Sequence, residues 1–373
     1  MDSRTSPNRP AAADAETNML SSYGLGSLKL PNRFVMSPMT RARTTDPDRV
    51  PIPIEAEYYV QRATAGLNVT GGTFISPQAI GGINIAGIYT EAQVDGWRKI
   101  TDAVHKAGGR IFLQIAHSAS ITHPSLLDGE TPVAPSAVNP NQKVMTKDGL
   151  VDTVLPRALT ISEIHAIVED FGKAAANARK AGFDGVELHG GNIFLIAQFL
   201  NTVTNRRTDE YGGTPEKRAR AVIEIITAMG TAWENGRIGV KLSPEISGAG
   251  GYSATDHVMA WLNEFKPAYL HLRRGFDAND KPIELMREHT FDHFRDLFKG
   301  TLIGNGGFDL TTANQHIERG DVDLVSFAKY YVANPDLVAR FEHNRSLAQP
   351  DRATYYTTGS KGYTDYPTLA EKS

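Results

Sequence analysis

Eight short apolar segments alternate with eight segments of helical periodicity along almost the entire chain. The apolar segments are rich in β-branched residues and bounded by Gly, Pro or polar residues, and they span residues 33–39, 67–76, 110–116, 182–189, 238–243, 269–273, 302–307 and 323–329. The helical segments span 53–65, 91–107, 162–181, 214–233, 254–265, 291–298, 310–319 and 335–342. Eight β–α units in series predict a (β/α)8 barrel. The length of 373 residues fits one such domain with insertions.

A doubly wound open sheet is the alternative fold for alternating strands and helices. That fold usually carries a glycine-rich dinucleotide-binding turn after its first strand. Residues 36–40, Met-Ser-Pro-Met-Thr, form the end of the first strand here and contain no glycine, so the barrel is favoured. At the starts of helices, Thr160 with Glu163 predicts a capping box, and Pro215 and Pro335 suit first-turn positions.

The connection after the third strand, residues 117–159, is unusually long for a barrel loop. It contains Val-Met-Thr-Lys-Asp-Gly-Leu-Val at 144–151, which predicts a β-hairpin turned at Asp148-Gly149. Barrel enzymes build their active sites from the loops at the carboxyl ends of the strands. We therefore expect this hairpin to cover an active site.

Composition and charge exclude several classes of protein. The chain has no Cys, so disulfides, thiolate nucleophiles and Cys-ligated metals are ruled out, and no metal site is predicted. A formal net charge of −3 without a basic run argues against nucleic acid as a partner. No apolar run is long enough to cross a bilayer, and residues 1–18 lack the apolar core of a secretory signal. We expect a disordered leader over 1–18, a single domain over 19–373 and a cytoplasmic location.

In a (β/α)8 barrel the carboxyl ends of all strands share one face, so residues at those ends are expected to converge. Neutral polar groups come from the first, third and fourth strands and positive charge from the fifth and eighth: Thr40, Gln114, His189, Asn192, Lys241 and Lys329. Gly306-Gly307, followed by a helix start at Leu310, predicts a phosphate cradle. A flat ligand with polar edges and a phosphate tail fits this set, and flavin mononucleotide (FMN) is the candidate.

The fourth strand ends in His189 and Asn192, which are separated by two glycines. Both side chains carry N–H donors that need no charge. Two neutral donors directed at one point suit a carbonyl or phenolate oxygen that gains negative charge during a reaction, so the pair predicts carbonyl-activating chemistry. Phe194 follows at a position where a proton donor would be useful. At the end of the sixth strand, Arg273-Arg274 is expected to be a solvated pair near the mouth of the barrel.

Five longer motifs lie at intervals along the chain. They are Asn-Arg-Phe-Val-Met-Ser-Pro-Met-Thr-Arg at 32–41, His-Gly-Gly-Asn at 189–192 with Gln-Phe-Leu at 198–200, Thr-Asn-Arg-Arg-Thr-Asp-Glu-Tyr-Gly-Gly at 204–213, Val-Ala-Asn-Pro-Asp-Leu at 332–337 and Gly-Tyr-Thr-Asp-Tyr-Pro at 362–367. Together they resemble the Old Yellow Enzyme family of flavin-dependent ene-reductases. The resemblance implies an FMN-binding (β/α)8 barrel whose bottom is closed by an N-terminal β-hairpin.

The resemblance also implies a reaction and a set of site residues. In this family NADPH reduces FMN, and an α,β-unsaturated carbonyl compound, an enone or enal, accepts the hydride at its β-carbon. His189 and Asn192 would hold the carbonyl oxygen, Lys241 would lie against the pyrimidine edge of the flavin, and Tyr356 would close the substrate side. The implied contacts of the flavin ring are Pro38, Met39, Thr40, Gly72 and Gln114, and those of the phosphate are Gly306, Gly307, Ala328 and Lys329.

The chain departs from the family pattern at several of these positions. The family usually has Tyr at Phe194, where it protonates the α-carbon of the substrate, and phenylalanine cannot donate a proton. The family usually has Arg at Lys241 and Lys329, and Lys keeps the charge but loses the bidentate hydrogen bonding of Arg. Gly is usual at Ala328. An aromatic residue is usual near Ala116 and a Gly-Arg pair near Ala119-Ser120, so this wall of the pocket is expected to be roomier and less polar.

These departures leave two functions open. The first is an FMN-dependent reductase of a specialised secondary-metabolism substrate, with water or another side chain supplying the proton. The second is a non-redox isomerase or cyclase in which FMN is lost or redox-inactive and His189 and Asn192 activate the carbonyl. Either enzyme would act on a small molecule, as a monomer or a homodimer.

Overall fold

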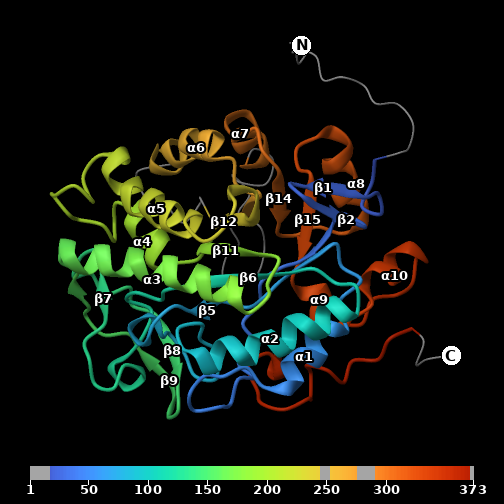
Figure 1. Ribbon diagram of the computed structural model, residues 1–373, viewed down its shortest axis with the longest axis horizontal. Helices are drawn as coiled ribbons and strands as arrows, with labels where there is room; N and C mark the ends of the chain where they lie inside the picture. The colour runs from blue at the N-terminus through green and yellow to red at the C-terminus, as the bar shows by residue number, and fades with distance from the viewer. Residues whose placement is uncertain (1–16, 244–252, 275–289, 370–373) are drawn as a thin grey trace.

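The computed structural model describes residues 17–243, 253–274 and 290–369 (Figure 1). Within these residues, eight strand positions form a closed parallel barrel surrounded by helices, which confirms the predicted (β/α)8 fold. The strands are, in chain order, β3 (Phe34–Met36), β4 (Leu67–Val69) with β5 (Thr73–Phe74), β6 (Ile111–Ala116), β11 (Gly185–Gly190), β12 (Ile238–Leu242), β13 (Tyr269–Arg273), β14 (Leu302–Asn305) and β15 (Leu324–Phe327). Pairing of β15 with β3 closes the ring.

Helices cover the outside of the barrel. Those predicted are α1 (Pro53–Val60), α2 (Glu91–Lys106), α3 (Ile161–Lys180), α5 (Pro215–Gly230), α6 (Ser253–Phe265), α7 (Thr290–Leu297), α8 (Leu310–Arg319) and α10 (Leu337–Glu342). The helices α4 (Leu195–Leu200) and α9 (Lys329–Ala333) were not predicted, nor were short 3-10 turns at Pro77–Ala79, Pro124–Leu126, Asn235–Arg237 and Arg352–Thr354.

The predicted helix starts are confirmed in two cases out of three. Thr160 Oγ1 accepts a hydrogen bond of 3.2 Å from the Glu163 N–H, and the Thr160 N–H donates to Glu163 Oε2 at 2.8 Å, so α3 begins with the expected capping box. Pro215 is in the first turn of α5. Pro335 lies outside α10, because that helix begins only after Asp336.

The interior of the barrel is layered, because successive side chains of a strand point to opposite faces. One set points outward and packs against the helices in the main hydrophobic core. The inward side chains nearest the amino ends of the strands form a separate apolar floor: Val35, Leu67, Val69, Phe112, Tyr269, Ile303 and Leu324. Gly185 and Gly239 leave room for two aromatic rings of this floor, since an added Cβ would lie 2.4 Å from Phe112 and 2.2 Å from Tyr269.

An N-terminal hairpin closes the bottom of the barrel, as the family resemblance implied. Its strands, β1 (Tyr23–Leu25) and β2 (Leu28–Leu30), pair antiparallel. Leu25 and Leu30 are completely buried and belong to the same cluster as the apolar floor. This end of the barrel is therefore filled with packed side chains, and open space for a ligand lies at the other end.

The long loop after β6 contains the predicted hairpin, formed by β8 (Lys143–Thr146) and β9 (Gly149–Asp152), and a short parallel pair, β7 (Val133–Ala134) with β10 (Arg157–Ala158). The predicted turn was wrong by one residue, because Thr146 pairs with Gly149 and the turn is made by Lys147 and Asp148. Thr146 Oγ1 stabilises this register by accepting from the Asp148 N–H at 3.2 Å and donating to Gly149 O at 3.0 Å.

Two strand ends near the site differ from the prediction. β14 ends at Asn305, and Gly306 and Gly307 follow it in a bend with φ angles of 112° and 73°. Lys329 is the first residue of α9 instead of the last residue of the eighth strand. Both strands therefore end earlier than predicted, and the residues after them lie at the carboxyl end of the barrel, where they line a cavity.

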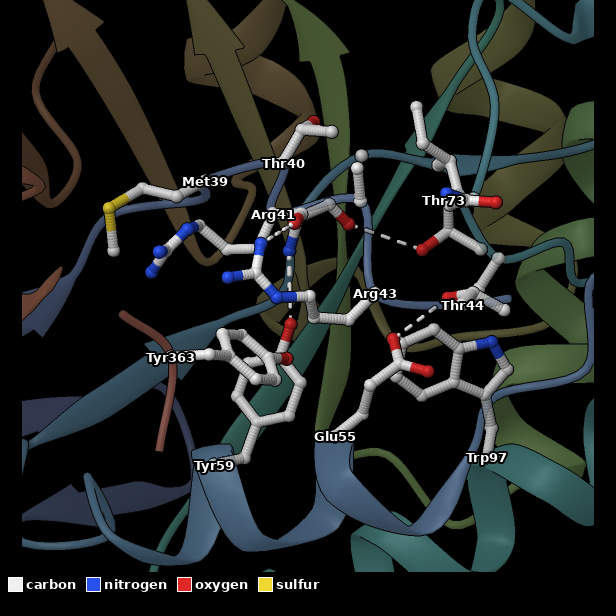
Figure 2. A pocket seen from close by; sticks show the side chains of 16 residues that line it. Met39, Thr40, Arg41, Arg43, Thr44, Glu55, Tyr59, Thr73, Trp97 and Tyr363 are labelled. Atoms are coloured by element: carbon white, nitrogen blue, oxygen red, sulfur yellow. Dashed lines mark hydrogen bonds between the residues drawn. The ribbon is translucent and has the colours of Figure 1, made fainter. Parts of the chain in front are cut away.

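Two buried arginines fix the C-terminal segment beside the end of β3 (Figure 2). Arg41 donates to Tyr355 O at 3.2 Å and to Gly362 O at 2.7 Å. Arg43 also donates to backbone carbonyl oxygens of this segment, and its guanidinium carbon lies 4.8 Å from the centroid of the Tyr363 ring. The segment that approaches the mouth of the barrel is thus held by hydrogen bonds to side chains that follow the first strand.

The two ends of the chain are described only in part. Of the disordered leader predicted over 1–18, residues 1–16 lie outside the described residues. None of the helices in the described ranges has both the length and the apolar character that crossing a bilayer requires.

Glu55, a buried carboxyl group at the start of α1, makes stability depend on pH (Figure 2). It accepts hydrogen bonds of 2.9 Å from the Ile52 N–H and from Thr44 Oγ1, and burial raises its pKa from 4.5 to about 7. The folded state therefore binds this proton more tightly than the unfolded state, and the free energy of unfolding is expected to fall as pH rises through this range.

We predict that Glu55→Gln abolishes this fall in the free energy of unfolding with rising pH. The fall amounts to at most about 3 kcal/mol, at roughly 1.4 kcal/mol per pKa unit. The Gln amide can still pair with both the Ile52 N–H and Thr44, so the fold is kept. Urea unfolding at pH values between 5 and 8 measures the effect, with the exposed Glu57→Gln as the matched control. An equal pH dependence in the Glu55→Gln variant and the parent chain would show that Glu55 is not the titrating group.

Candidate active site

A cavity of about 610 Å³, the main cavity, opens at the carboxyl ends of the barrel strands. The predicted site residues that line it are Pro38, Met39, Thr40, Gly72, Gln114, His189, Asn192, Phe194, Lys241, Ala328, Lys329 and Tyr356. The hairpin in the long loop adds Lys143, Val144 and Met145 to its wall. Among the described lining residues six are positively charged and none is acidic, so the cavity suits an anionic or electron-rich ligand.

A second cavity of about 440 Å³, the side cavity, adjoins the first. The two cavities share Arg273, Asn305, Ala328 and Lys329. Gly306 and Gly307 line the side cavity, and their positive φ angles bring bare backbone to its surface. Lys329 makes no hydrogen bond or ion pair with the residues that the structure describes, so its ammonium group is available to an anion. Every predicted site residue therefore lines one of two adjoining cavities.

His189 is held as a neutral ring at the end of β11. Its Nδ1 accepts a hydrogen bond of 3.3 Å from the Gly191 N–H. Burial, helped by the positive charges of Lys241 and Arg273, lowers the pKa of the ring to about 3. The single ring proton is therefore on Nε2, which is left as a donor to a ligand in the main cavity.

Asn192 follows β11 in the left-handed conformation, with φ of 56°, which Asn tolerates better than most residues. Its backbone N–H donates to Ser243 Oγ at 3.4 Å. Its side-chain Oδ1 accepts a hydrogen bond of 2.5 Å from Arg273 Nη1. Because the acceptor is occupied in this way, the NH2 group of the carboxamide remains as a donor. His189 and Asn192 thus both present N–H groups at the main cavity.

Phe194 places an apolar ring where the family resemblance expects a phenol. It is the N-cap residue of α4, and its ring packs edge-on against His189, with centroids 4.9 Å apart and an interplanar angle of 79°. Ala116, the last residue of β6, lines the same cavity with a single methyl group. These two residues make this part of the cavity apolar and unable to supply a proton.

A buried polar layer lies directly above the apolar floor, two residues further along each strand. Glu187 accepts hydrogen bonds from Gln114 Nε2 at 2.7 Å and from His271 Nδ1 at 2.9 Å. His271 Nε2 pairs with Ser326 Oγ at 2.7 Å, and Asn305 Nδ2 donates to the same hydroxyl at 2.8 Å. Gln114 was predicted from the sequence, whereas Glu187, His271, Asn305 and Ser326 were not, because their inward orientation follows only from the register of the strands.

Lys241 belongs to the same layer and is almost completely buried. Burial lowers the pKa of its ammonium group to about 8, with Arg273 acting in the same direction and Glu187 opposing it. Its Nζ donates to Ser37 Oγ at 3.3 Å. The lysine therefore keeps its charge at neutral pH and can stabilise negative charge on a ligand in the main cavity.

The prediction that Arg273 and Arg274 form a solvated pair was wrong. Arg273 is on the inward face of β13, lines both cavities and hydrogen-bonds Asn192. Arg274 is on the other face, where its guanidinium carbon lies 4.4 Å from the ring centroid of Phe291 and 4.8 Å from that of Phe308. Alternation along the strand separates the two side chains and leaves only Arg273 at the site.

The donors and charges of the two cavities fit FMN. In the side cavity, Lys329 and the glycine bend suit a phosphate. In the main cavity, Gln114 donates its NH2 group to Glu187 and so keeps its Oε1 as an acceptor; an added Cβ on Gly72 would lie 3.4 Å from this oxygen. Lys241 supplies positive charge for an electron-rich ring. Within the described ranges, no group of three or more His, Cys, Asp or Glu is arranged to hold a metal ion.

The fold and the site define a class, the barrel enzymes that bind a flavin at the carboxyl ends of their strands, and comparison with known proteins agrees. The model of the NADH:flavin oxidoreductase / NADH oxidase family matches residues 22–348. The chain is 38% identical to 12-oxophytodienoate reductase 1 of Oryza sativa subsp. japonica, over 96% of this chain and 95% of that protein. It is also 38% identical to a Leishmania infantum protein described as a probable flavin mononucleotide-dependent alkene reductase, over 96% of this chain and 99% of that protein.

Solved structures give the same result. Morphinone reductase superimposes with a TM-score of 0.91 at 38% identity, over 97% of this chain and 99% of that chain, and one of its structures is a complex with tetrahydroNAD. The chain belongs to the NADH:flavin oxidoreductase / NADH oxidase family, and the resemblance to the Old Yellow Enzymes is confirmed. It is a flavin-dependent oxidoreductase, and these relatives do not support the non-redox alternative.

The paired donors lead to a binding prediction. Replacing both His189 and Asn192 by Ala is expected to weaken binding of a simple phenol at least tenfold, because each lost hydrogen bond to an electron-rich oxygen contributes about 1 kcal/mol or more. Absorbance titration of the purified protein measures the dissociation constant, and the exposed His343→Ala serves as the control. Unchanged affinity in the double variant would mean that the phenol oxygen binds elsewhere.

Proposed function

We propose that the enzyme reduces the C=C bond of an α,β-unsaturated carbonyl compound with hydride from NADPH. The observation that carries the proposal is the presence of two N–H donors, on His189 and Asn192, at a cavity that also presents Gln114 and Lys241. The names of two relatives, a 12-oxophytodienoate reductase and an alkene reductase, support a reaction of this kind. When bound, FMN supplies the hydride transfer between the nicotinamide and the β-carbon of the substrate.

His189 and Asn192 bind the carbonyl oxygen in this proposal. Negative charge accumulates on that oxygen as the β-carbon gains hydride, and both donors are in place before the substrate arrives. The imidazole suits this role because its pKa of about 3 keeps the ring neutral at neutral pH. It therefore acts as a hydrogen-bond donor and not as an acid that protonates the oxygen. The residues that would face the flavin ring are Pro38, Met39, Thr40, Gly72, Gln114 and Lys241, and those that would face its phosphate are Gly306, Gly307, Ala328 and Lys329.

The proton for the α-carbon comes from water in our proposal. Phe194 has no proton to donate, and neither Asp nor Glu is among the described residues that line the main cavity. A volume of about 610 Å³ leaves space for ordered water beside a ligand. Water would then complete the addition by giving a proton to the α-carbon and leaving as hydroxide.

The shape of the site supports a substrate larger than a simple enone. Ala116 leaves room beside His189 and Asn192, the pair that we call the carbonyl anchor. Tyr356, which is 61% exposed, lies on the segment held by Arg41 and Arg43 and would form an outer wall of the site. We therefore propose a specialised substrate, such as one of secondary metabolism. A cytoplasmic location, where NADPH is supplied, and a monomeric or homodimeric state are further parts of this proposal.

A redox titration tests the proposed function. The purified protein, supplied with FMN, is expected to show the absorbance of oxidised flavin, to lose it on anaerobic addition of NADPH, and to regain it when an enone is added. A protein that takes up no FMN, or whose oxidised spectrum persists with NADPH, would contradict reductase activity.

Phe194→Tyr is expected to accelerate reduction of a simple enone by roughly tenfold or more, because a positioned general acid typically contributes at least that much. The rate of flavin reoxidation by the enone, followed by stopped-flow absorbance, measures the effect. Phe194→Leu changes the ring but adds no proton donor, so it should show no acceleration. Equal rates for the Tyr and Phe forms would show that protonation does not limit the reaction.

A further inference from the structure

We propose that Arg273 is a positioning residue of the carbonyl anchor. It orients the Asn192 carboxamide so that the NH2 group faces the substrate oxygen, and it places the positive charge of its guanidinium beside that oxygen. The inference rests on the proposed function and deepens it. It assigns a role to a residue for which the motifs shared with the family imply none.

The fold determines where the Arg273 side chain points. On β13 the inward positions alternate as Tyr269, His271 and Arg273, which belong in turn to the apolar floor, the polar layer and the wall of the main cavity. Arg273 lines the main cavity and the side cavity, so it lies where the two meet. The register of β13 therefore directs its guanidinium at the site.

The contact with Asn192 settles the orientation of its carboxamide. A carboxamide has one acceptor atom and one donor group, and an unpaired Asn could present either of them to a ligand. Arg273 Nη1 donates to Asn192 Oδ1 at 2.5 Å, and an Arg has no acceptor that could bind the NH2 group instead. The backbone of Asn192 is held as well, by the bond of its N–H to Ser243 Oγ. Only the donor side of the carboxamide then remains for a carbonyl oxygen.

The charge of Arg273 reaches the other groups of the anchor. It adds to the lowering of the pKa of both His189 and Lys241 by burial, so its charge acts on both groups. A stable positive charge matters more in this enzyme, because the negative charge on the substrate oxygen persists until water protonates the α-carbon.

The test uses the oxidised flavoprotein and a series of para-substituted phenols that are similar in size but differ in acidity. Dissociation constants at one pH are measured by absorbance titration for the parent enzyme, Arg273→Met and Arg273→Lys. The Met side chain keeps much of the aliphatic volume of Arg and removes its charge and donors. Lys180→Met is the matched control, because Lys180 is an exposed charged residue that pairs with Glu91 at 3.1 Å and lines neither cavity.

In the parent enzyme, affinity is expected to rise steeply with phenol acidity. Arg273→Met should flatten this dependence, weakening the most acidic phenol about tenfold and the least acidic one little, since a charge-assisted interaction is lost. Arg273→Lys should restore part of the slope, and Lys180→Met should leave it unchanged. In a double-mutant cycle, Arg273→Met combined with Asn192→Ala should lose less affinity than the sum of the two single losses, because part of the Arg273 effect is exerted through Asn192.

Two results would overturn the inference. One is an equal loss of affinity for every phenol in Arg273→Met, which would indicate a general structural role. The other is a loss that adds fully to that of Asn192→Ala. A parent enzyme that binds none of the phenols would also refute it, because there would be no anchor to position. Failure of NADPH to bleach the flavin would instead overturn the reductase function alone, since phenol binding needs no turnover.

Discussion

The ionised carboxylate of Glu187, at the centre of the barrel, is the group on which the rest of the site depends. Burial opposes its ionisation, but hydrogen bonds from His271 and Gln114 and the charge of Lys241 hold its pKa below the usual range. A buried charge without such partners would cost several kcal/mol, so these residues must be present together. Glu187 in turn fixes the Gln114 carboxamide with its oxygen free and keeps the neutral His271 ring in one tautomer. The polar groups beneath the main cavity are thus oriented before any ligand binds.

The same strands provide the stability of the barrel and its chemistry, because their inward residues change character along the strand. On β12, Gly239 makes room for the Tyr269 ring in the apolar floor, and Lys241 reaches the cavity two residues later. On β11, Gly185 admits Phe112 below, Glu187 follows in the polar layer, and a ligand-facing histidine comes last. The floor, sealed by the N-terminal hairpin, keeps water from one end of the buried charges, and this exclusion strengthens their interactions.

Much of the fold could be predicted because eight apolar segments bounded by Gly, Pro and polar residues allow few topologies, and shared strand ends bring the predicted site residues to one face. What escaped prediction depends on which face of a fully buried strand a residue occupies. Strands with both faces buried lack the usual alternation of apolar and polar residues, so Arg273 could be separated from Arg274, and Glu187 and His271 could be recognised, only once the register was known. The one-residue error in the hairpin turn had a local cause, because the hydroxyl of Thr146 favours the earlier turn.

The arrangement of charge at the site follows from a limit on how closely cations can be packed. Lys241 and Arg273 each disfavour a further positive charge nearby, and the ring of His189 is neutral for that reason as well as by burial. A histidine at this place cannot keep a second proton at neutral pH under these conditions. In the proposed function, the neutral N–H groups of His189 and Asn192 would therefore contact the substrate oxygen, and Lys241 and Arg273 would supply the positive charge. With Phe194 unable to supply a proton, this arrangement would let the site stabilise negative charge on the proposed substrate until water protonates the α-carbon.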